Sequence, residues 1–436
     1  MIDKKCFAAL KRGVEYWNKW RANHSHHPLD LRGINLSNET LLGINFTGVN
    51  LAGATLVKSN FCGANFDGAD LTGANLTEAN LSGASLTGVN LTVAILARVN
   101  YRGAELIGAN LSLANLDNAD LRVADFSAAE LSGASFYQAN LNGVIFQGAN
   151  LTQANFQLAK LTQANFNHAN LTQANFAYAD LTKAQFEQAN LNEAIFSRAM
   201  LRRAKMIQAD LSEANLNEAN LQEINLSKSD LIEACLANAS LVGACLTKAN
   251  LTKADLSQAD LTRANLTDAN LMQTQAKNAN FNQSQLTGAC LENFQINRQT
   301  SFEKVICRYL YLEYCGKNRV PYHRQQSLSL REFKSTLQDL IGLIEVRFHQ
   351  LIDWSLMLEA VAELKLKYKT QKIELRSIET KSNFQFIVKL KVVPHAKTAE
   401  IKQYLQQQYS LLLLAKNQLS SVTKIDAKPL NCYRQN

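Results

Sequence analysis

The feature that most constrains this chain is an apolar residue that recurs at every fifth position from residue 31 to residue 296, without insertion or deletion. These positions, which we call centres, are nearly all Leu or Phe. Two places before each centre the chain usually carries Ala. Each five-residue unit therefore has one large and one small apolar site, and its other three positions are mostly polar.

A period of five matches neither the 3.6 residues of a helical turn nor the alternation of a long strand. Strict repetition of this kind favours a solenoid, in which each unit buries its apolar residues only by stacking on the next coil. A coiled coil or a helical repeat is strongly disfavoured, because five-residue spacing would spread the apolar side chains around a helix.

The units A-N-L-T-Q, A-N-F-N-H, A-D-L-T-K and A-N-L-S-G resemble the pentapeptide-repeat family, whose units follow A-(N/D)-L-x-x. The resemblance covers residues 31–296. It implies a mainly β fold, a right-handed quadrilateral β-helix with four units in each coil and one unit on each face. One coil would then contain 20 residues.

The sequence predicts further segments around this β-helix, which we place at residues 31–300. Residues 1–30 are expected to form an amphipathic capping helix and a loop, since an open solenoid end exposes apolar sites and unpaired strand edges. Residues 301–329 lose the period and are expected to form a closing strand and a linker. A local distortion is expected at residues 272–285, where Ala276 replaces a large centre and would leave a void.

From residue 330 to residue 436 the pattern predicts a small α+β domain of order α-α-β-β-α. The expected helices span residues 330–350, 353–369 and 396–416, and the expected strands span residues 372–380 and 384–393. The segments IDW, SIETK and VVPHAKTAEIKQ resemble a module that follows pentapeptide repeats and signalling-type domains in cyanobacterial proteins. That resemblance implies an adaptor role.

Two internal details follow from a 20-residue coil. Phe alternates with Leu at the centres 126–196, so the Phe side chains should stack as two buried ladders on opposite faces. The third place of each unit is often Gly from residue 33 to residue 148 and mostly a larger residue from 153 onward. Because Gly tolerates positive φ without steric cost, we expect one corner geometry early in the solenoid and another later.

Charged residues are distributed unequally over the four expected faces. The face with centres 31, 51, 71 and so on carries more acidic than basic side chains, and it is the candidate interaction face. Its carboxylates are Asp70, Glu130, Glu193, Asp210, Glu213, Asp230, Glu233 and Glu292, against Arg32 and Lys253. The opposite face should be mildly basic, although chance scatter of so few charges explains the difference equally well.

The remaining composition narrows the class of protein. The net charge of +8 is concentrated in the flanks, and basic charge spread over the last 140 residues fits a solvated surface better than a nucleic-acid site. The eight cysteines lack zinc-type spacing and suggest reduced thiols. We expect no signal peptide, no membrane span, no catalytic residue, no cofactor and no metal, hence a cytoplasmic protein.

Two classes of function remain. The first is a non-enzymatic scaffold, a rigid rod that presents a C-terminal adaptor-like domain and binds protein partners of unknown identity, with a homodimer left open. The second comes from the resemblance: pentapeptide-repeat relatives that imitate duplex DNA bind a topoisomerase such as DNA gyrase. A mimic needs dense negative charge, because duplex DNA carries about one charge per 1.7 Å. The modest net charge of the repeat makes the scaffold the preferred hypothesis.

Overall fold

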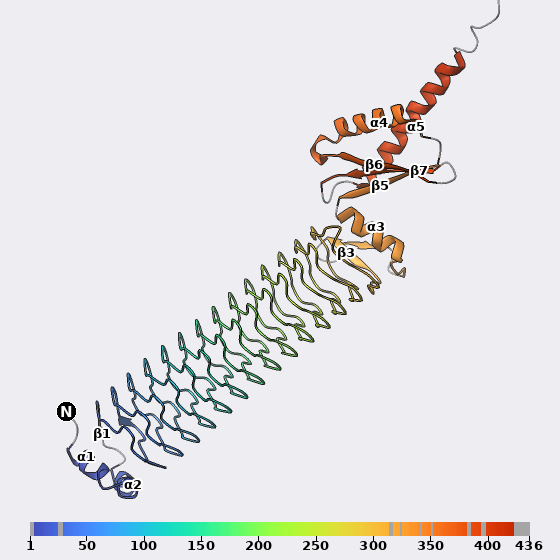
Figure 1. Cartoon of the computed structure of the whole chain (residues 1–436). Helices are drawn as coiled ribbons and strands as arrows, with labels where there is room; N and C mark the ends of the chain where they lie inside the picture. Colours follow the sequence, from blue (N-terminus) through green and yellow to red (C-terminus); the bar gives the residue numbers. More distant parts are fainter. Residues whose placement is uncertain are drawn as a thin grey trace, which may run out of the picture. The chain divides into compact units, whose positions relative to one another are not determined.

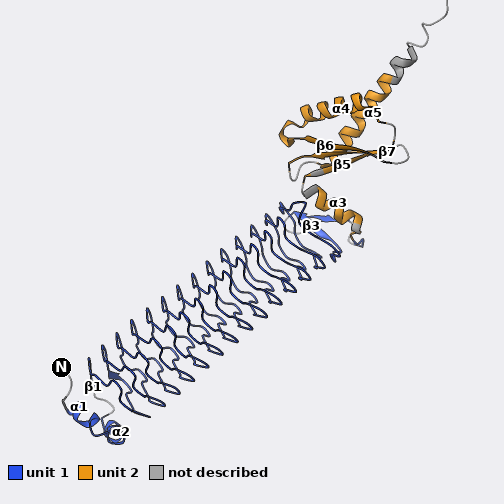
Figure 2. Ribbon diagram, viewed as in Figure 1, with its two compact units in different colours: residues 1–327 blue, residues 328–436 orange. Residues whose placement is uncertain are grey.

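The computed structural model contains two compact units, residues 1–327 and residues 328–436 (Figure 2). It describes residues 4–24, 29–313, 317–322, 325–340, 342–349, 352–381, 385–393 and 398–422. In the first unit the helices and strands are α1 (Lys4–Leu10), α2 (Val14–Ala22), β1 (Leu29–Asp30), β2 (Val49–Asn50), β3 (Leu310–Glu313) and β4 (Lys317–Val320). In the second unit they are α3 (Leu330–Leu340), β5 (Leu343–Phe348), α4 (Trp354–Lys367), η1 (Lys369–Gln371), β6 (Glu374–Lys381), β7 (Gln385–Lys391) and α5 (Thr398–Val422).

The first unit is a β-helix whose coils stack in the way that Figure 1 shows between β1 and β3. Parallel β-bridges join residues 20 apart at every fifth position, from Asn35↔Thr55 to Gln275↔Gln295. Four bridged positions fall within each coil, so each coil contains four five-residue units. This arrangement confirms the solenoid with 20 residues per coil.

The apolar positions of the units fill the interior of the coils. The centre Leu151 and the small-site Ala154 are both fully buried, and nearly all their equivalents are buried too. The Asn and charged side chains lie outside, and so do the Ser and Thr side chains, except at small sites such as Ser59 and Thr274, which are buried. Burial of a large apolar side chain stabilises the folded state by about 1.5–3 kcal/mol before entropy is subtracted. The stack of Leu and Phe centres is therefore the main source of stability.

The predicted Phe ladders are present and in contact with each other. Within one ladder the rings of Phe136 and Phe156 stack with centroids 4.7 Å apart and planes 3° apart. In the other ladder Phe146 and Phe166 stack at 5.1 Å. The two ladders meet edge to face, since the rings of Phe156 and Phe166 are 5.8 Å apart at 83°. Both geometries are favoured by the ring quadrupole.

The expectation of two corner geometries is wrong. The third place of the unit has a left-handed conformation along the whole repeat, whether the residue is Gly63 at φ 66°, Val123 at φ 53° or Gln163 at φ 61°. The coil spacing fixes this backbone, because the amide of each such residue donates to a carbonyl of the next coil, as Gln163 does to Thr182 at 3.0 Å. Non-glycine residues therefore accept a strained φ that stacking imposes.

Replacing Val123 by Gly tests this imposed conformation. A β-branched residue in the left-handed region costs on the order of 1–3 kcal/mol, and the exposed side chain loses little packing when removed. We expect Val123→Gly to stabilise the chain by about 1 kcal/mol after the entropy of Gly in the unfolded state is included. The measurement is a denaturant melt. Asn118→Gly at an equivalent corner is the control, since Asn tolerates this conformation; an equal gain there would contradict the assignment.

The N-terminal cap consists of two short helices, whereas the sequence predicted one. The helical conformation is interrupted between α1 and α2 at Gly13, which has a φ of 94°. The predicted capping role is visible in α2, where Trp17 is fully buried and its indole ring lies 5.6 Å from the ring of Phe46. Residues 25–28 of the expected loop lie outside the described part of the chain.

Side chains of α2 also donate hydrogen bonds to backbone carbonyl groups of the first coil. Within the repeat, the carbonyl of Asn50 accepts from the amide of Leu31. At the equivalent carbonyl of Asn45, one unit earlier, the donor is the indole Nε1 of Trp17 at 2.7 Å. Arg21 donates in the same way to the carbonyl of Thr47. The cap therefore replaces the hydrogen bonds of a preceding coil as well as its apolar contacts.

The C-terminal end of the solenoid departs from the sequence prediction in two places. Residues 272–285 keep the 20-residue bridge spacing to the preceding coil, so the distortion expected from the small centre Ala276 is wrong. Beyond residue 296 the coil continues with one inserted residue: Ser301 bridges Asn280, and Phe302 stacks on Phe281 at 5.0 Å. Strand β3 then pairs antiparallel with β4, which lies inside the expected linker.

The second unit packs helices against a three-stranded antiparallel sheet of order β5-β7-β6. Phe348 of β5 stacks on Phe386 of β7 at 4.6 Å, and Tyr409 of α5 lies edge-on to Phe348 at 5.2 Å. The expected helix over residues 330–350 is wrong. Gly342, with a φ of 66°, follows α3, and the alternating apolar residues beyond it form β5. The order is therefore α-β-α-β-β-α.

Candidate functional site: an acidic strip on the solenoid

Seven of the eight carboxylates counted on the candidate interaction face, all except Glu292, are the residues predicted to bind a partner, and they lie on one side of the solenoid. Four of them belong to a single ladder of β-bridges, namely Asp70, Glu130, Asp210 and Asp230. The other three occupy the left-handed corner that directly follows this face, namely Glu193, Glu213 and Glu233. Their role in binding stays a prediction.

Only five of the seven come close together. Asp210 and Asp230 are direct neighbours in the ladder. The corner residues Glu193, Glu213 and Glu233 belong to the three successive coils around them. We call these five residues the acidic strip. Asp70 and Glu130 belong to the same side but lie three or more coils away from the strip.

The corner column of the strip stacks charges of the same sign. The amide of Glu193 donates to Ser212 at 2.9 Å, and the amide of Glu213 donates to Ile232 at 2.8 Å, so the three Glu residues hold successive levels of one column. Coils lie about 4.8 Å apart, so each carboxylate faces a like charge above or below it. Such neighbours repel each other.

Elsewhere in the solenoid, charged corner residues one coil apart mostly form complementary pairs. The carboxylate of Glu78 is 2.6 Å from the guanidinium of Arg98, and that of Glu218 is 2.8 Å from Arg198. Only at its end does the strip meet a cation, where Lys253 lies 2.7 Å from Glu233. Among the described residues Glu213 makes no ion pair. The strip is therefore a column of three acidic residues whose charges do not neutralise one another, whereas the like-charged corner neighbours elsewhere, such as Lys228 and Lys248, are basic.

Local hydrogen bonds hold the strip carboxylates in place. The amide and hydroxyl of Ser212 donate to Asp210 at 3.0 and 2.7 Å. The side-chain amide of Gln173 donates to Glu193 at 2.9 Å. Partial burial, with the charge of Asp210 adding to it, raises the pKa of the Asp230 carboxyl above its usual value. The strip thus concentrates negative charge on a rigid surface.

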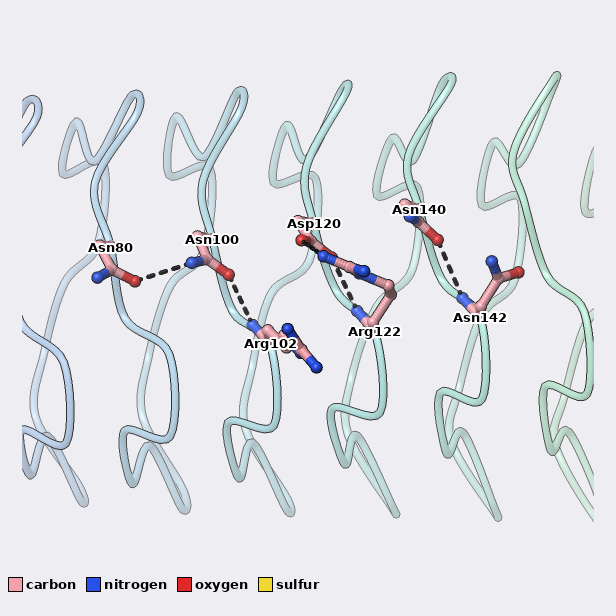
Figure 3. A network of polar contacts seen from close by, with 7 residues as sticks. All are labelled: Asn80, Asn100, Arg102, Asp120, Arg122, Asn140 and Asn142. Carbon is pink, nitrogen blue, oxygen red and sulfur yellow. Dashed lines mark hydrogen bonds and ion pairs between the residues drawn. The ribbon is translucent and has the colours of Figure 1, made fainter.

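The predicted basic face neutralises much of its own charge. Arg122 forms a two-pronged contact with Asp120, with distances of 2.8 and 2.6 Å (Figure 3). The contact holds the pKa of the Asp120 carboxyl below its usual value, because the Arg122 guanidinium donates hydrogen bonds to it. Arg202 and Arg203 both pair with Glu223. This face therefore offers fewer uncompensated charges than the sequence count indicates.

Two features of the solenoid surface escaped the sequence analysis. Asp30 belongs to the ladder of the acidic face, since β1 pairs with β2, and it binds Arg32 through both carboxylate oxygens. It precedes the first counted unit and was left out for that reason. Exposed apolar residues such as Leu158 and Tyr178 follow one another at a corner. The signal in the sequence is an apolar residue in the third place of a unit, where the side chain points to solvent.

Nowhere in the described ranges do three or more His, Cys, Asp or Glu side chains gather in a way that could hold a metal ion. Cys235 and Cys245 are free thiols on different ladders of the coil, as expected. None of the helices in the described part of the chain combines the length and the apolar character needed to cross a bilayer.

Models of known protein families match the repeat. A family model described as "Pentapeptide repeats (8 copies)" matches residues 30–68, 44–83, 56–92, 84–122, 179–217, 209–247 and 249–293. A second model, described as "Pentapeptide repeat region", matches residues 119–196. No curated protein matches the chain.

Solved structures of similar proteins include two from cyanobacteria. HetL, a pentapeptide repeat protein involved in heterocyst differentiation regulation from Nostoc sp. strain PCC 7120, is 24% identical, with 62% of this chain and 95% of that chain covered and a TM-score of 0.21. Rfr23 from Cyanothece 51142 is 29% identical, with 29% and 91% covered and a TM-score of 0.18. QnrB1, a plasmid-mediated fluoroquinolone resistance protein, is 15% identical, with 64% and 90% covered and a TM-score of 0.16.

Proposed function

Because the chain belongs to the pentapeptide-repeat family, we propose that it is a non-enzymatic scaffold whose acidic strip docks a protein with a basic groove. The family resemblance also supports the right-handed sense of the coil and the four-sided section. The second unit on the same chain then acts as an adaptor, with a different charge and a different fold.

The observation that supports this proposal is the same-sign column of Glu193, Glu213 and Glu233. Stacking like charges one coil apart disfavours the folded state, and the chain avoids such stacking where Glu78 pairs with Arg98. A basic partner surface would relieve this repulsion on binding. The strip therefore gains more electrostatic binding free energy from such a partner than a neutral surface would. Complementary charge also accelerates encounter and selects the partner.

The strip fits a protein groove better than a long imitation of duplex DNA. Five carboxylates in three coils at about 4.8 Å per coil give about one charge per 3 Å, roughly half the density of a duplex. On either side of Asp210 and Asp230 the same ladder carries the neutral residues Asn170, Asn190 and Asn250. A topoisomerase groove that holds many phosphates would meet this density over one short stretch only.

Affinity capture from the native host with the immobilised full chain tests the proposal. Wild-type protein is compared with the triple variant Glu193→Gln, Glu213→Gln and Glu233→Gln, which removes three charges without changing side-chain size. We expect a protein that wild type retains and the variant loses, and that elevated salt releases, because exposed charges are screened by salt.

The matched control neutralises three other exposed glutamates at corners, Glu78, Glu218 and Glu223, each of which already pairs with arginine. This control should retain the captured protein. Equal loss with both variants, or equal retention with both, would contradict docking at the strip. A supercoiling assay with DNA gyrase distinguishes the scaffold hypothesis from the DNA-mimic hypothesis. A mimic inhibits or protects the enzyme, whereas a scaffold leaves its activity unchanged.

A further inference from the structure

A cavity of about 550 Å³ in the second unit is lined mainly by cations. Its walls come from three elements: α3 supplies Arg331, Lys334, Ser335 and Gln338, β5 supplies Glu345 and Arg347, and α5 supplies Lys402. Four of these seven side chains are basic and one is acidic. The volume falls within the range of about 300–1,000 Å³ that is typical of small-molecule sites.

One face of α3 provides the first wall. The lining residues Arg331, Lys334, Ser335 and Gln338 follow the spacing i, i+3, i+4 and i+7, which places them on a single side of a helix. The helix start is fixed by a capping box, since Ser329 Oγ donates to Glu332 at 2.7 Å and accepts from the Glu332 amide at 3.3 Å. Glu332 is thereby engaged at the cap and does not line the cavity.

The outer face of β5 provides the second wall. Ile344, Val346 and Phe348 are buried in the core of the unit, so Glu345 and Arg347 project from the other side of the strand. The single carboxylate of the cavity, Glu345, lies 3.9 Å from Lys389 on the neighbouring strand.

Three of the four cations that line the cavity have no carboxylate partner in the described part of the domain. Among the described residues Arg331, Lys334 and Arg347 form no ion pair with any carboxylate. Three like charges that converge from two elements repel one another and so raise the electrostatic energy of the cavity. Binding of an anion, or removal of one of the cations, lowers this energy. The arrangement is therefore complementary to a ligand with several negative charges.

We propose that this cavity binds a small molecule that carries two or more linked phosphate groups. Arginine and lysine are the side chains that bind phosphate oxygens most strongly, arginine through two parallel hydrogen bonds. Ser335 and Gln338 add neutral donors on the helix face. A single phosphate would engage few of these donors, whereas a chain of phosphates can reach cations on the separate walls.

The cavity suits a small ligand better than a nucleic-acid strand. A strand needs a positive groove that continues along its backbone. Here the polar face of the sheet beyond β5 includes Glu379 and Glu374, which pair with Lys389 and Arg376. Carboxylates therefore interrupt the basic charge on the sheet beyond β5.

Isothermal titration of the full chain with sodium tripolyphosphate at low ionic strength tests the proposal. Loss of one charge-assisted contact weakens binding by about tenfold, so Arg347→Gln and Lys334→Gln should each raise the Kd by about that factor. Lys365→Gln is the matched control, because Lys365 is an exposed cation of the same unit on α4 and does not line the cavity. Its Kd should equal that of wild type.

A variant that binds more tightly distinguishes an effect on the binding site from damage to the fold, because a damaged fold only weakens binding. Glu345→Gln removes the only carboxylate of the lining, while Lys389 keeps its partner Glu379 at 2.6 Å. This variant should bind tripolyphosphate several-fold more tightly than wild type, and wild type should bind orthophosphate at least tenfold more weakly than tripolyphosphate. The proposal is overturned by absence of binding heat with wild type, by equal weakening in Lys365→Gln, or by equal affinity for the two anions. None of these outcomes depends on the acidic strip.

Discussion

Replacing Phe156 by Asp is expected to unfold the coils around it. The ring of Phe156 is fully buried, stacks on Phe176 at 4.8 Å and meets Phe146 edge-on at 5.8 Å. Truncating such a ring costs about 3–5 kcal/mol, and a buried carboxyl without a partner adds several more. Calorimetry and circular dichroism should show a large loss of melting temperature and of folded signal.

The control for this substitution introduces the same residue two places away. Leu158 lies at an exposed corner in the left-handed conformation, which Asp tolerates, so Leu158→Asp should change stability by less than about 1 kcal/mol. An unchanged melting curve for Phe156→Asp would contradict the buried assignment of the Phe ladders.

Removing the cap side chain Trp17 is expected to open the first coils of the solenoid. Trp17→Ala removes the ring that covers Phe46 and leaves the carbonyl of Asn45 without its donor. The loss should be about 4–7 kcal/mol, from the truncated ring and the unsatisfied carbonyl together. Because each coil contacts only its neighbours, the damage should stay near this end.

Hydrogen exchange followed by mass spectrometry measures this local opening. We expect faster exchange in residues 29–50 and unchanged exchange in the coils beyond residue 100, together with concentration-dependent association through the opened strand edge. Tyr16→Ala is the control, since the contact of the Tyr16 ring is with the guanidinium of Arg12 in the cap itself. Uniform destabilisation along the whole repeat would contradict a local cap.

The sequence predicted the solenoid because its period is a direct consequence of how the coils stack. A Leu or Phe at a centre is buried whatever its neighbours are, so the position in the unit decides burial, and Phe136 and Phe156 could be placed in one ladder from numbering alone. The candidate face followed from the same numbering. Which of its residues lie together was not predicted, because the sequence count did not separate the corner column from the ladder beside it.

The remaining differences arise where local preference and long-range stacking disagree. Val123 has no preference for a left-handed corner, yet the hydrogen bonds between coils impose one. The insertion before Ser301 hides a further coil, because a shift of one residue breaks a count of five without breaking the stack. The sequence predicts a helix where β5 lies, because an apolar run next to α3 continues the helical pattern and only Gly342 marks the change.

Carboxylate footprinting of the full chain tests the central claim most directly. The chain is labelled with a carbodiimide and an amine, alone and with the captured partner, and each modified carboxylate is located by mass spectrometry. The account predicts that the partner protects Glu193, Glu213 and Glu233 and leaves Glu78 and Glu218 as reactive as before. Protection of Glu78 and Glu218, with the strip unprotected, would contradict the acidic strip as the docking surface.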